Sequence, residues 1–286
     1  MNRKPSWLLV PHRENKNREY VQGLLAGLGL NTVCQEALCP NQAECYENKT
    51  TTFMILGVNC TRNCRFCNVK HQPPEPVDTD ESAHIAFATE KLGLAYVVIT
   101  SVTRDDLSDG GASQFAATIK AVKKHCPTTA VEVLIPDLNG NLEALSIITS
   151  IAPDVISHNL ETVPDLYQNV RPEANYRRSL MLLDAIKEQN SQIHSKSSLM
   201  LGFGEKKEQV LRVMDDLRKV DCDFLTLGQY LAPSKKHIAV QEYIHPDIFD
   251  WYKEIAYAKG FKHVASGPFV RSSYRAGEAL AFSNWE

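Results

Sequence analysis

Six of the eight cysteines fall between Cys34 and Cys67. Three of these six belong to the segment Cys60-Thr61-Arg62-Asn63-Cys64-Arg65-Phe66-Cys67, which has the spacing C-x3-C-x2-C. Cysteine thiolates are the usual ligands of iron–sulfur clusters. Three thiolates on one short loop can hold three corners of a cubane and leave the fourth iron open, and an open position is what a reactive metal centre needs. The spacing therefore predicts a reactive iron–sulfur cluster at this loop.

A second trio lies upstream, with the spacing C-x4-C-x5-C over Cys34, Cys39 and Cys45. It again offers three thiolates and leaves one corner open. The competing interpretation for both trios is structural zinc, but structural zinc sites usually have paired C-x2-C knuckles and four ligands. The remaining two, Cys126 and Cys222, lie apart among helix-like residues. We expect them to pack as small hydrophobic side chains.

The elements that must position the cysteines alternate regularly from residue 53 onward. Short apolar, β-branched runs are followed by longer amphipathic segments, which predicts a parallel sheet with helices outside. Six such units are too few for a closed eight-stranded barrel, so the prediction is an α/β fold with a partial (β/α)6 TIM-like barrel. The predicted strands are 53–58, 95–100, 130–135, 154–157, 197–201 and 224–227, with a weak seventh at 263–265; the predicted helices are 81–92, 113–124, 141–149, 176–189, 206–219 and 247–259.

The Cys60 loop directly follows the first predicted strand, and right-handed crossovers bring all strand ends to one face. Polar residues such as Ser101, Asp105 and Asp137 follow the other strands. Loops are polar in general, but the recurrence after every strand favours a functional face. We predict three segments: an N-terminal extension with the upstream cysteines (1–52), the barrel (53–266) and a C-terminal segment (267–286).

Composition narrows the classes of function. The chain has 286 residues, 43% of them hydrophobic, and a net charge of −3 from 31 basic and 34 acidic side chains. No run of Lys or Arg stands out, so no nucleic-acid partner is predicted. The sequence contains no stretch of about 18 apolar residues, so no membrane span is predicted. The first residues, Met1–Trp7, lack the apolar core of a targeting signal, and the expected location is the cytoplasm.

The C-x3-C-x2-C spacing, with Phe66 just before the last cysteine, resembles the signature of the radical S-adenosylmethionine (SAM) superfamily. The resemblance implies that SAM chelates the open iron. One electron from the cluster then cleaves SAM to a 5′-deoxyadenosyl radical, which removes hydrogen from an unreactive carbon. No amino-acid side chain can do this, so a cofactor must supply the chemistry.

Within that superfamily, the upstream trio together with Arg271-Ser272-Ser273-Tyr274 resembles the lipoyl synthase family. In that family a serine of this motif is the fourth ligand of an auxiliary cluster, which points to Ser273 here. Taken without the cysteines, a Ser pair would be a turn or helix cap. The resemblance covers residues 30–277, and further matching stretches are 100–107, 109–111, 158–162, 171–172, 196–205 and 227–234.

The resemblance implies sulfur insertion at C6 and C8 of an octanoyl chain that is attached to a lysine of a carrier domain. Two [4Fe-4S] clusters and SAM are the implied cofactors, and the auxiliary cluster is the sulfur donor. The implied partners are an octanoylated lipoyl carrier domain or the glycine cleavage H protein, with reduced flavodoxin or ferredoxin as electron donor. No assembly motif is apparent, so a monomer is expected.

Residue roles follow from the same resemblance. Cys60, Cys64 and Cys67 would hold the radical-generating cluster, and the upstream trio with Ser273 the auxiliary one. Gly110 and Gly111 would let SAM approach the backbone, since glycine has no Cβ. Ala112 stands where the general SAM loop ends in an acid. The remaining candidate contacts to SAM are Thr100, Ser101, Asn159, Glu161 and Arg171.

Arg171 could pair with the methionine carboxylate, because the guanidinium group matches its shape. Each candidate could instead be an internal ion pair or a cap. Two other functions remain open. One is a different radical SAM enzyme with an auxiliary cluster, such as a biotin-synthase-like sulfur inserter or a peptide-modifying enzyme. The other is a zinc-binding adaptor without catalytic activity, whose purified protein would be colourless rather than brown.

Overall fold

The computed structural model of the chain describes residues 4–9, 17–47 and 51–283. Residues Met1–Arg3 of the predicted N-terminal extension lie outside this range, as do 10–16, 48–50 and, at the C-terminal end, 284–286. The chain divides into two compact units. The N-terminal unit comprises His12–Arg62 and Asn68–Ile156, and the C-terminal unit comprises Met1–Pro11, Asn63–Cys67 and Ser157–Glu286.

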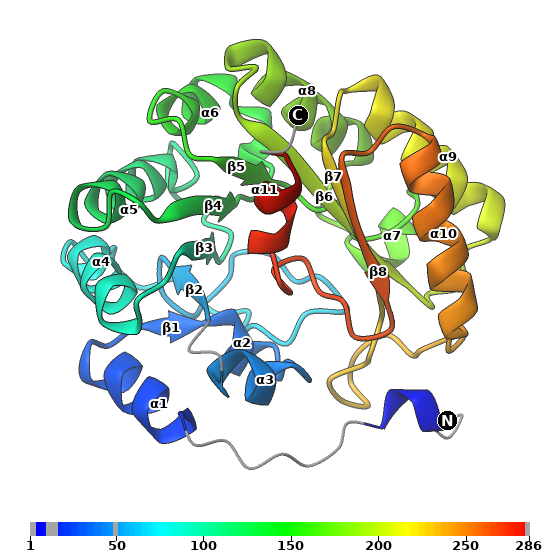
Figure 1. Ribbon diagram of the computed structural model, residues 1–286, viewed down its shortest axis with the longest axis horizontal. Coiled ribbons are helices and arrows are strands. Elements are labelled where there is room, and N and C mark those ends of the chain that lie inside the picture. The colour runs from blue at the N-terminus through cyan, green and yellow to red at the C-terminus, as the bar shows by residue number, and fades with distance from the viewer. Residues whose placement is uncertain (1–3, 10–16, 48–50, 284–286) are drawn as a thin grey trace. The chain divides into compact units, whose positions relative to one another are not determined.

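The N-terminal unit is built on short strands that follow chain order. The two-residue β1 pairs antiparallel with β2, whereas β2 to β4 are parallel. Helices α4 to α6 run along the outer side of these strands (Figure 1). The elements are α1 (Arg18–Gly27), β1 (Asn31–Thr32), α2 (Val33–Glu36), α3 (Gln42–Glu47), β2 (Thr52–Ile55), α4 (Glu81–Leu92), β3 (Tyr96–Ser101), α5 (Ala112–His125), β4 (Ala130–Leu134), the 3₁₀ helix η2 (Leu138–Gly140), α6 (Leu142–Thr149) and β5 (Val155–Ser157), where the division falls.

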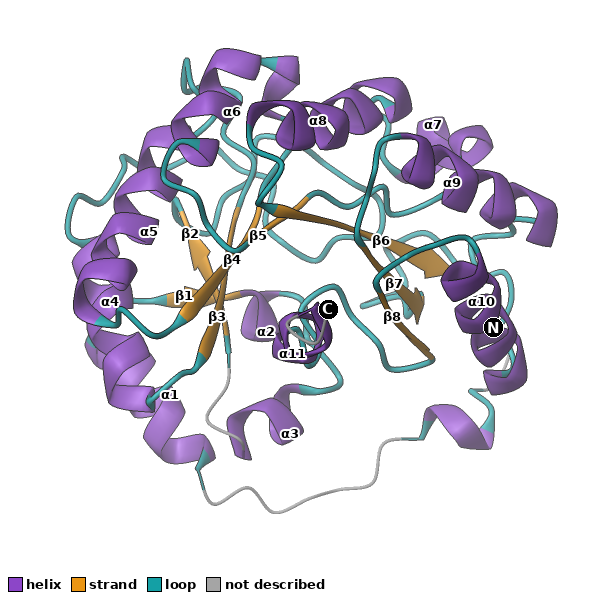
Figure 2. Ribbon diagram, turned by 45° about the horizontal axis from the view of Figure 1, so that its top comes forward, coloured by secondary structure: helices purple, strands orange, loops and turns teal. Residues whose placement is uncertain are grey.

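The C-terminal unit contains three parallel strands in chain order, seen side by side in Figure 2. Helix α9 shows why the sequence folds this way: Val210, Val213, Met214 and Leu217 recur at helical spacing and are buried, which gives the helix one apolar face. The elements are η1 (Ser6–Leu8), η3 (Pro164–Leu166), α7 (Tyr167–Val170), α8 (Tyr176–Gln189), β6 (His194–Leu201), α9 (Lys207–Lys219), β7 (Phe224–Gln229), α10 (Pro246–Ala258), β8 (His263–Gly267) and α11 (Gly277–Ser283).

The α/β prediction is confirmed. Each of the seven predicted strands has a counterpart, including the weak one at 263–265, and within each unit the strand order follows the chain. Each of the six predicted helices is present, and those at 81–92 and 176–189 have the predicted bounds. Segments 17–47 and 268–283 form elements outside the alternation, among them α1 to α3 and α11.

The predicted C-terminal end of the first strand is wrong. The strand was expected to reach Val58, but β2 ends at Ile55. Leu56 has φ 69°, a left-handed conformation that breaks the extended path. Its N–H group donates to both carboxylate oxygens of Glu81, each at 3.1 Å, so it is lost to the sheet. The chain therefore turns early, just before the cysteine loop.

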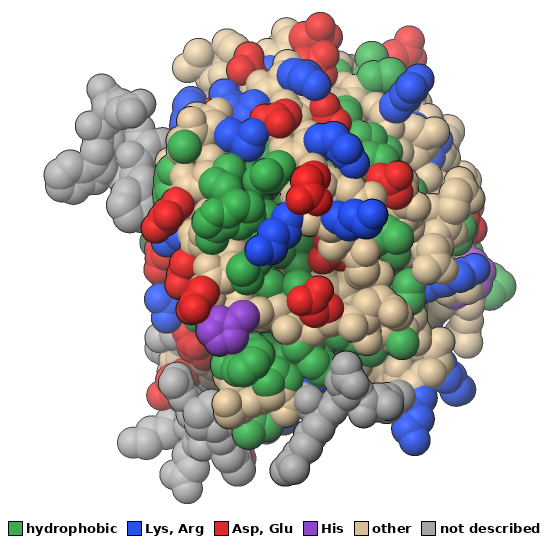
Figure 3. Space-filling view, turned by 90° about the vertical axis from the view of Figure 1, so that its right-hand side faces the viewer, with side chains coloured by type: hydrophobic (Ala, Val, Ile, Leu, Met, Phe, Trp, Pro, Cys, Tyr) green, Lys and Arg blue, Asp and Glu red, His purple; other side chains and the backbone are tan. Residues whose placement is uncertain are grey.

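Charges of both signs are intermixed on the face shown in Figure 3, where hydrophobic side chains also gather. Among the exposed large hydrophobic residues of the C-terminal unit are Trp251 and Tyr257 of α10. Lys207 of α9 places its ammonium group 5.3 Å from the centre of the Trp251 ring. Of the helices that the structure describes, none is both long enough and apolar enough to cross a membrane.

Candidate iron–sulfur and S-adenosylmethionine site

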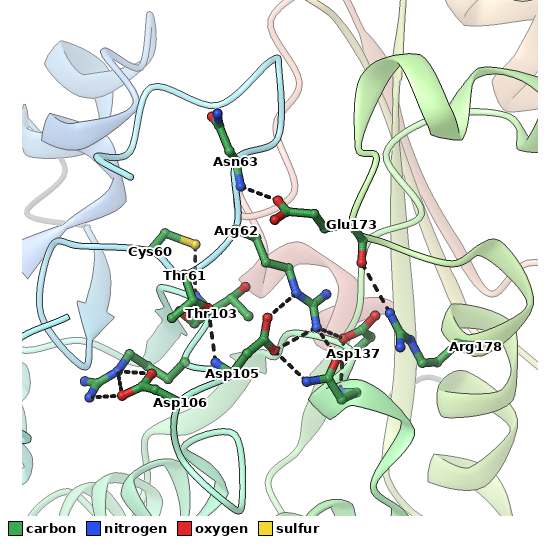
Figure 4. A network of polar contacts seen from close by, with 12 residues as sticks. Cys60, Thr61, Arg62, Asn63, Thr103, Asp105, Asp106, Asp137, Glu173 and Arg178 are labelled. Atoms are coloured by element: carbon green, nitrogen blue, oxygen red, sulfur yellow. Dashed lines mark hydrogen bonds and ion pairs between the residues drawn. The ribbon is translucent and has the colours of Figure 1, made fainter. Parts of the chain in front are cut away.

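Cys60 is fixed from several sides within the N-terminal unit. Its N–H group donates to the carbonyl of Lys70 at 2.8 Å. Its Sγ accepts a hydrogen bond from the backbone N–H of Thr103 at 3.3 Å (Figure 4). Thr103 lies in the loop that follows β3. Cys60, the predicted cluster ligand on the β2 loop, is thus tied to the neighbouring strand end through its sulfur atom.

Arg62, two residues further on, is the centre of a buried polar network in the same unit (Figure 4). Its Nε and Nη2 atoms donate to the two carboxylate oxygens of Asp105 at 2.7 and 2.8 Å. Nη2 also lies 2.7 Å from Asp137 Oδ1 and donates to Asn139 Oδ1 at 2.7 Å. Burial by itself would lower the pKa of Arg62, but its hydrogen bonds and ion pairs with Asp105 and Asp137 outweigh this and raise it. The guanidinium group stays charged and joins three strand-end loops.

Cys64 to Cys67 belong to the C-terminal unit, and main-chain hydrogen bonds fix them there. Arg65 N donates to the carbonyl of Val170 at 3.0 Å, and Ile238 N donates to the carbonyl of Arg65 at 3.1 Å. His237 Nε2 lies 3.1 Å from the carbonyl oxygen of Cys67. A carbonyl only accepts, so Nε2 carries the hydrogen. His237 and Ile238, in the segment after β7, therefore hold this half of the loop by hydrogen bonds to its main-chain carbonyls.

Phe66, the aromatic residue before the last cysteine, packs in an apolar cluster of the C-terminal unit. Its ring centre is 6.4 Å from that of Phe203, which in turn stacks on Tyr230 at 4.2 Å. Val170 completes the buried centre of this cluster. At the other end of the segment, Asn63 N donates to Glu173 Oε2 at 2.6 Å (Figure 4).

The upstream trio is positioned by two short helices of the N-terminal unit. Thr32 caps α2 by accepting from Gln35 N at 3.3 Å, which orients the turn that bears Cys34. Cys34 is buried, and its sulfur accepts from Thr51 Oγ1 at 3.8 Å. Cys39 follows directly, with its N–H 3.2 Å from the carbonyl of Cys34, and Cys45 is carried by α3.

One contact joins the two cysteine-bearing segments. Asn68 follows Cys67 in the sequence, and its side-chain Nδ2 donates to the carbonyl of Glu36 at 2.7 Å. Glu36 lies between Cys34 and Cys39. Asn68 and Glu36 are both part of the N-terminal unit. Asn68 therefore lies beside the segment that carries Cys34 and Cys39.

The segment that contains Ser273 crosses over β7 in the C-terminal unit. A Cβ on Gly228 would stand 2.0 Å from the carbonyl oxygen of Val270. Arg271 Nη1 donates to that same carbonyl at 2.7 Å, and Tyr274 N donates to the carbonyl of Arg271 at 3.0 Å. Gly228 is thus required for this crossing, a role that its neighbours in the sequence do not reveal. The assignment of Ser273 as a cluster ligand stays a prediction.

The SAM candidates of the N-terminal unit differ from one another. Thr100 Oγ1 donates to the carbonyl of Leu134 at 2.9 Å, so the protein already uses this hydroxyl. Ser101 Oγ is buried without a hydrogen-bond partner. Gly110 and Gly111 have φ values of 60° and 92°, and a Cβ on Gly111 would stand 2.3 Å from Leu56 Cδ1. The missing Cβ atom therefore also accommodates Leu56.

The SAM candidates of the C-terminal unit form one cluster. Asn159 Nδ2 donates to Glu161 Oε1 at 3.0 Å, and Arg171 Nη1 donates to the carbonyls of Asn159 and Leu160 at 2.7 and 3.2 Å. Burial raises the pKa of the Glu161 carboxyl, against the opposing charge of Arg171. Asn159 Oδ1 is buried and has no hydrogen-bond partner. Arg171 thus orders this loop, and its pairing with a carboxylate stays a prediction.

The residues fit the implied cofactors. All eight cysteines are reduced thiols. Within residues 4–9, 17–47 and 51–283, no group of three or more His, Cys, Asp or Glu side chains could hold a single metal ion. Thiolates suit iron–sulfur clusters. The buried, unpartnered atoms Ser101 Oγ and Asn159 Oδ1 are suited to a polar ligand, since such atoms are costly unless a partner binds.

Cys222 and Cys126 lie outside these groups. Cys222 is buried, its thiol contacts the carbonyl of Phe224 at 3.4 Å, and burial raises its pKa to about 12. Burial also raises the pKa of Cys126. Thiols held protonated are poor metal ligands. Cys222 is thus suited to packing, in agreement with the sequence interpretation, whereas Cys126 is only partly buried.

Sequence reasoning missed several residues that position the site. Glu81 lies on α4, far along the chain from the cysteine loop, yet it binds Leu56 N. His237 is 170 residues from Cys67 in the sequence. Asp137 was noted only as a polar residue after a strand. The sequence signal was an arginine, Arg62, between two cysteines; its burial, and so its need for a carboxylate partner, is seen only in the structure.

Comparisons with known proteins show the family of this chain. Residues 54–217 match the family model of the radical SAM superfamily. The chain is 52% identical over 280 residues to the lipoyl synthase of Alkaliphilus metalliredigens, covering 98% of this chain and 97% of that protein. It is 55% identical over 276 residues to the lipoyl synthase of Caldicellulosiruptor saccharolyticus, covering 96% and 97%.

Solved structures are similar in fold. SuiB of Streptococcus suis bound to S-adenosylmethionine superposes with a TM-score of 0.57 at 13% identity, over 87% of this chain and 60% of that one. Methylornithine synthase gives a TM-score of 0.53 at 13% identity, over 79% and 70%. These likenesses support the predicted partial barrel. The near-complete match to curated relatives shows that this chain belongs to the lipoyl synthase family of the radical SAM superfamily.

Proposed function

We propose that this chain is a lipoyl synthase that inserts sulfur at C6 and C8 of an octanoyl chain carried by a lipoyl carrier protein. Its relatives at 52% and 55% identity are named lipoyl synthase. The observation that supports the proposal is the hydrogen bond from Asn68, which follows Cys67, to Glu36, which lies between Cys34 and Cys39. Sulfur transfer between two clusters requires such proximity.

In this proposal Cys60, Cys64 and Cys67 hold the radical-generating cluster. Cys34, Cys39, Cys45 and Ser273 hold the auxiliary one. When bound, the clusters and SAM supply the electron, the hydrogen-abstracting radical and the sulfur. The other residues of the site bind and orient.

Several of the chain's own groups would bind SAM. Ser101 Oγ and Asn159 Oδ1 would each satisfy a polar atom of SAM. Arg171 keeps the Asn159–Glu161 loop in place through the carbonyl of Asn159. We also propose Glu161, Gly110, Gly111 and Thr100 as further contacts to SAM. The Thr100 hydroxyl donates its hydrogen to the carbonyl of Leu134, so toward SAM it would act as a hydrogen-bond acceptor.

We propose an octanoylated lipoyl carrier domain or the glycine cleavage H protein as the carrier. Reduced flavodoxin or ferredoxin would donate the electron. We further propose that the chain acts as a monomer in the cytoplasm. Each of these finer assignments follows from the family resemblance and is independent of the residue roles.

Anaerobic reconstitution followed by mass spectrometry of an octanoylated carrier tests the function. We expect about eight irons per chain, as two cubanes require. The carrier should gain two sulfur atoms and lose two hydrogen atoms. Colourless protein that retains stoichiometric zinc in its native state would contradict the proposal. SAM cleavage without sulfur insertion would favour a different radical SAM enzyme.

Two variants separate the clusters. Cys39→Ala should still cleave SAM but yield no dithiolane, because only the auxiliary cluster is lost. Cys67→Ala should abolish SAM cleavage itself. Cys126→Ala is the matched control, since this thiol lies outside both trios, and it should retain about eight irons and full activity. Equal iron loss in all three variants would contradict the assignment.

A further inference from the structure

Several hydrogen bonds around Arg62 join the cysteine loop to the loop that follows β3. Thr61 Oγ1 donates to the carbonyl of Thr103 at 3.0 Å and accepts from Asp105 N at 3.1 Å. Thr61 N donates to the same Thr103 carbonyl, also at 3.0 Å. The cysteine loop and the loop after β3 are therefore joined on both sides of the Thr103 peptide, all within the N-terminal unit.

The ion pairs of Arg62 lock this register. Asp105 is two residues after Thr103, and its carboxylate binds the guanidinium group in a two-pronged arrangement. Asp137, whose side chain is inaccessible to solvent, binds the same group from the β4 loop. Figure 4 shows Arg62 between these carboxylates, with Cys60 and Thr103 beside them. Paired charges in a buried place leave the loop few alternative arrangements.

We infer that Arg62 is a positioning residue, which with Asp105 and Asp137 aims the Thr103 N–H at the sulfur of Cys60 and so raises the reduction potential of the radical-generating cluster. The inference rests on the proposed function. Hydrogen bonds to cluster sulfurs are a main determinant of potential. They favour the reduced cluster because it carries more negative charge, and groups that orient ligands tune metal centres in the same way.

The test uses the full chain in a Cys34→Ala/Cys39→Ala/Cys45→Ala background, where one cluster remains. The first readout is the midpoint potential, followed by the electron paramagnetic resonance of the reduced cluster. The second is the magnetic coupling between the cluster and peptide nitrogens in protein labelled with ¹⁵N-threonine. Thr103→Val keeps the N–H group of residue 103 but carries no ¹⁵N there. A coupling that disappears in this variant is therefore assigned to residue 103.

We expect Arg62→Gln to lose the residue 103 coupling and to shift the potential to a more negative value. Arg62→Lys keeps the charge without the two-pronged geometry and should give an intermediate result. Asp137→Asn should move both readouts in the same direction as Arg62→Gln. It provides the test if Arg62→Gln does not take up iron. The control is Asp223→Asn, which removes a buried carboxylate whose partners are Lys187, His194 and Lys262. It should leave both readouts unchanged.

Three results would overturn the inference, and they are distinguishable. If Arg62→Gln and Asp137→Asn bind about four irons with the potential and coupling of the unmodified background, Arg62 has no positioning role. If the background protein itself binds no cluster while Cys60, Cys64 and Cys67 are intact, the proposed function fails and the inference with it. A potential that falls in Asp223→Asn as well would assign the effect to general destabilisation, which also contradicts a specific role.

Discussion

The two ends of the C-x3-C-x2-C loop are held by different kinds of interaction. At Cys60 the restraints are side-chain ion pairs and hydrogen bonds around Arg62. At Cys64 to Cys67 they are hydrogen bonds to backbone carbonyls and the stacking of Phe203 on Tyr230. The first end depends on the identity of a few charged residues. The second depends on the path of the chain and on the shape of its apolar neighbours.

This difference predicts how each end responds to change. Removing one partner of a buried ion pair leaves a charge without compensation. Hydrogen bonds between backbone groups survive most substitutions, so the second end should fail only when its packing is removed. The four predictions below test this contrast in the chain without cofactors.

The largest effect is expected from Phe203→Ala. Phe203 is 3% exposed and packs between Phe66 and Tyr230, so the substitution leaves a cavity. Its free energy of unfolding should fall by about 4 kcal/mol in urea titration. The control Phe87→Ala, on an exposed face of α4, should change it by less than about 0.5 kcal/mol. Similar values for both variants would mean that packing does not hold the second end.

Asp137→Ala should cost about 3 kcal/mol, since it leaves the buried Arg62 with Asp105 as its remaining carboxylate. Asp137→Asn keeps a hydrogen-bond acceptor and should cost less. Urea titration of both variants measures the difference. If Asp137→Ala were as stable as the unmodified chain, ion pairs would not stabilise the Cys60 end of the loop.

The sequence allowed these ends to be distinguished only in part. Apolar residues at helical and strand spacing, such as Val210 to Leu217, predict most elements to within a few residues, because burial of one face dominates local structure. The cysteine spacing predicts the cluster site, and the roles of its residues stay predictions. The left-handed Leu56 and the two-residue β1 were not predictable, because a distant carboxylate and a neighbouring strand determine them.

The contact of His237 with Cys67 also lay beyond sequence reasoning. It joins residues 170 positions apart, and no local pattern records such a pairing. Gly228 likewise reads as an ordinary strand glycine until Val270 is seen across it. The ligand role of Ser273 and the division into three segments stay predictions.

A pH titration of stability should sharpen the contrast, because the C-terminal unit contains a partly buried histidine, His263, with a lowered pKa. Burial, followed by the charges of Lys196 and Lys253, lowers the pKa of His263 to about 4 from an ordinary 6.5. Between these values the unfolded state binds more protons, so stability is lost as the pH falls from about 6.5 to 4. The ring is only partly buried, so the loss should be about 1 to 2 kcal/mol.

His263→Asn should remove this part of the pH dependence, while Asp137→Asn should leave it in place. Unfolding measured at several pH values from 4 to 7 compares the two variants. An unchanged slope in His263→Asn would show that other groups titrate in this window.

The smallest effect is expected from His237→Ala, which removes one side-chain hydrogen bond to the carbonyl of Cys67. The free energy of unfolding should fall by about 1 kcal/mol. Nuclear magnetic resonance of labelled histidine should find the hydrogen on Nε2, with Nδ1 facing Ser234 Oγ at 2.9 Å. A hydrogen found on Nδ1 alone would contradict the contact.

Strand β1 has a consequence for handling the protein. Asn31 and Thr32 pair with Met54 and Phe53 along the outer edge of β2, and a bare edge of this kind recruits strands from other molecules. We therefore expect Asn31 and Thr32 to limit aggregation by covering this edge of β2. A protein shortened to begin after Thr32 keeps the cysteine-bearing helices α2 and α3 but loses the cover of this edge, and we expect it to form insoluble material.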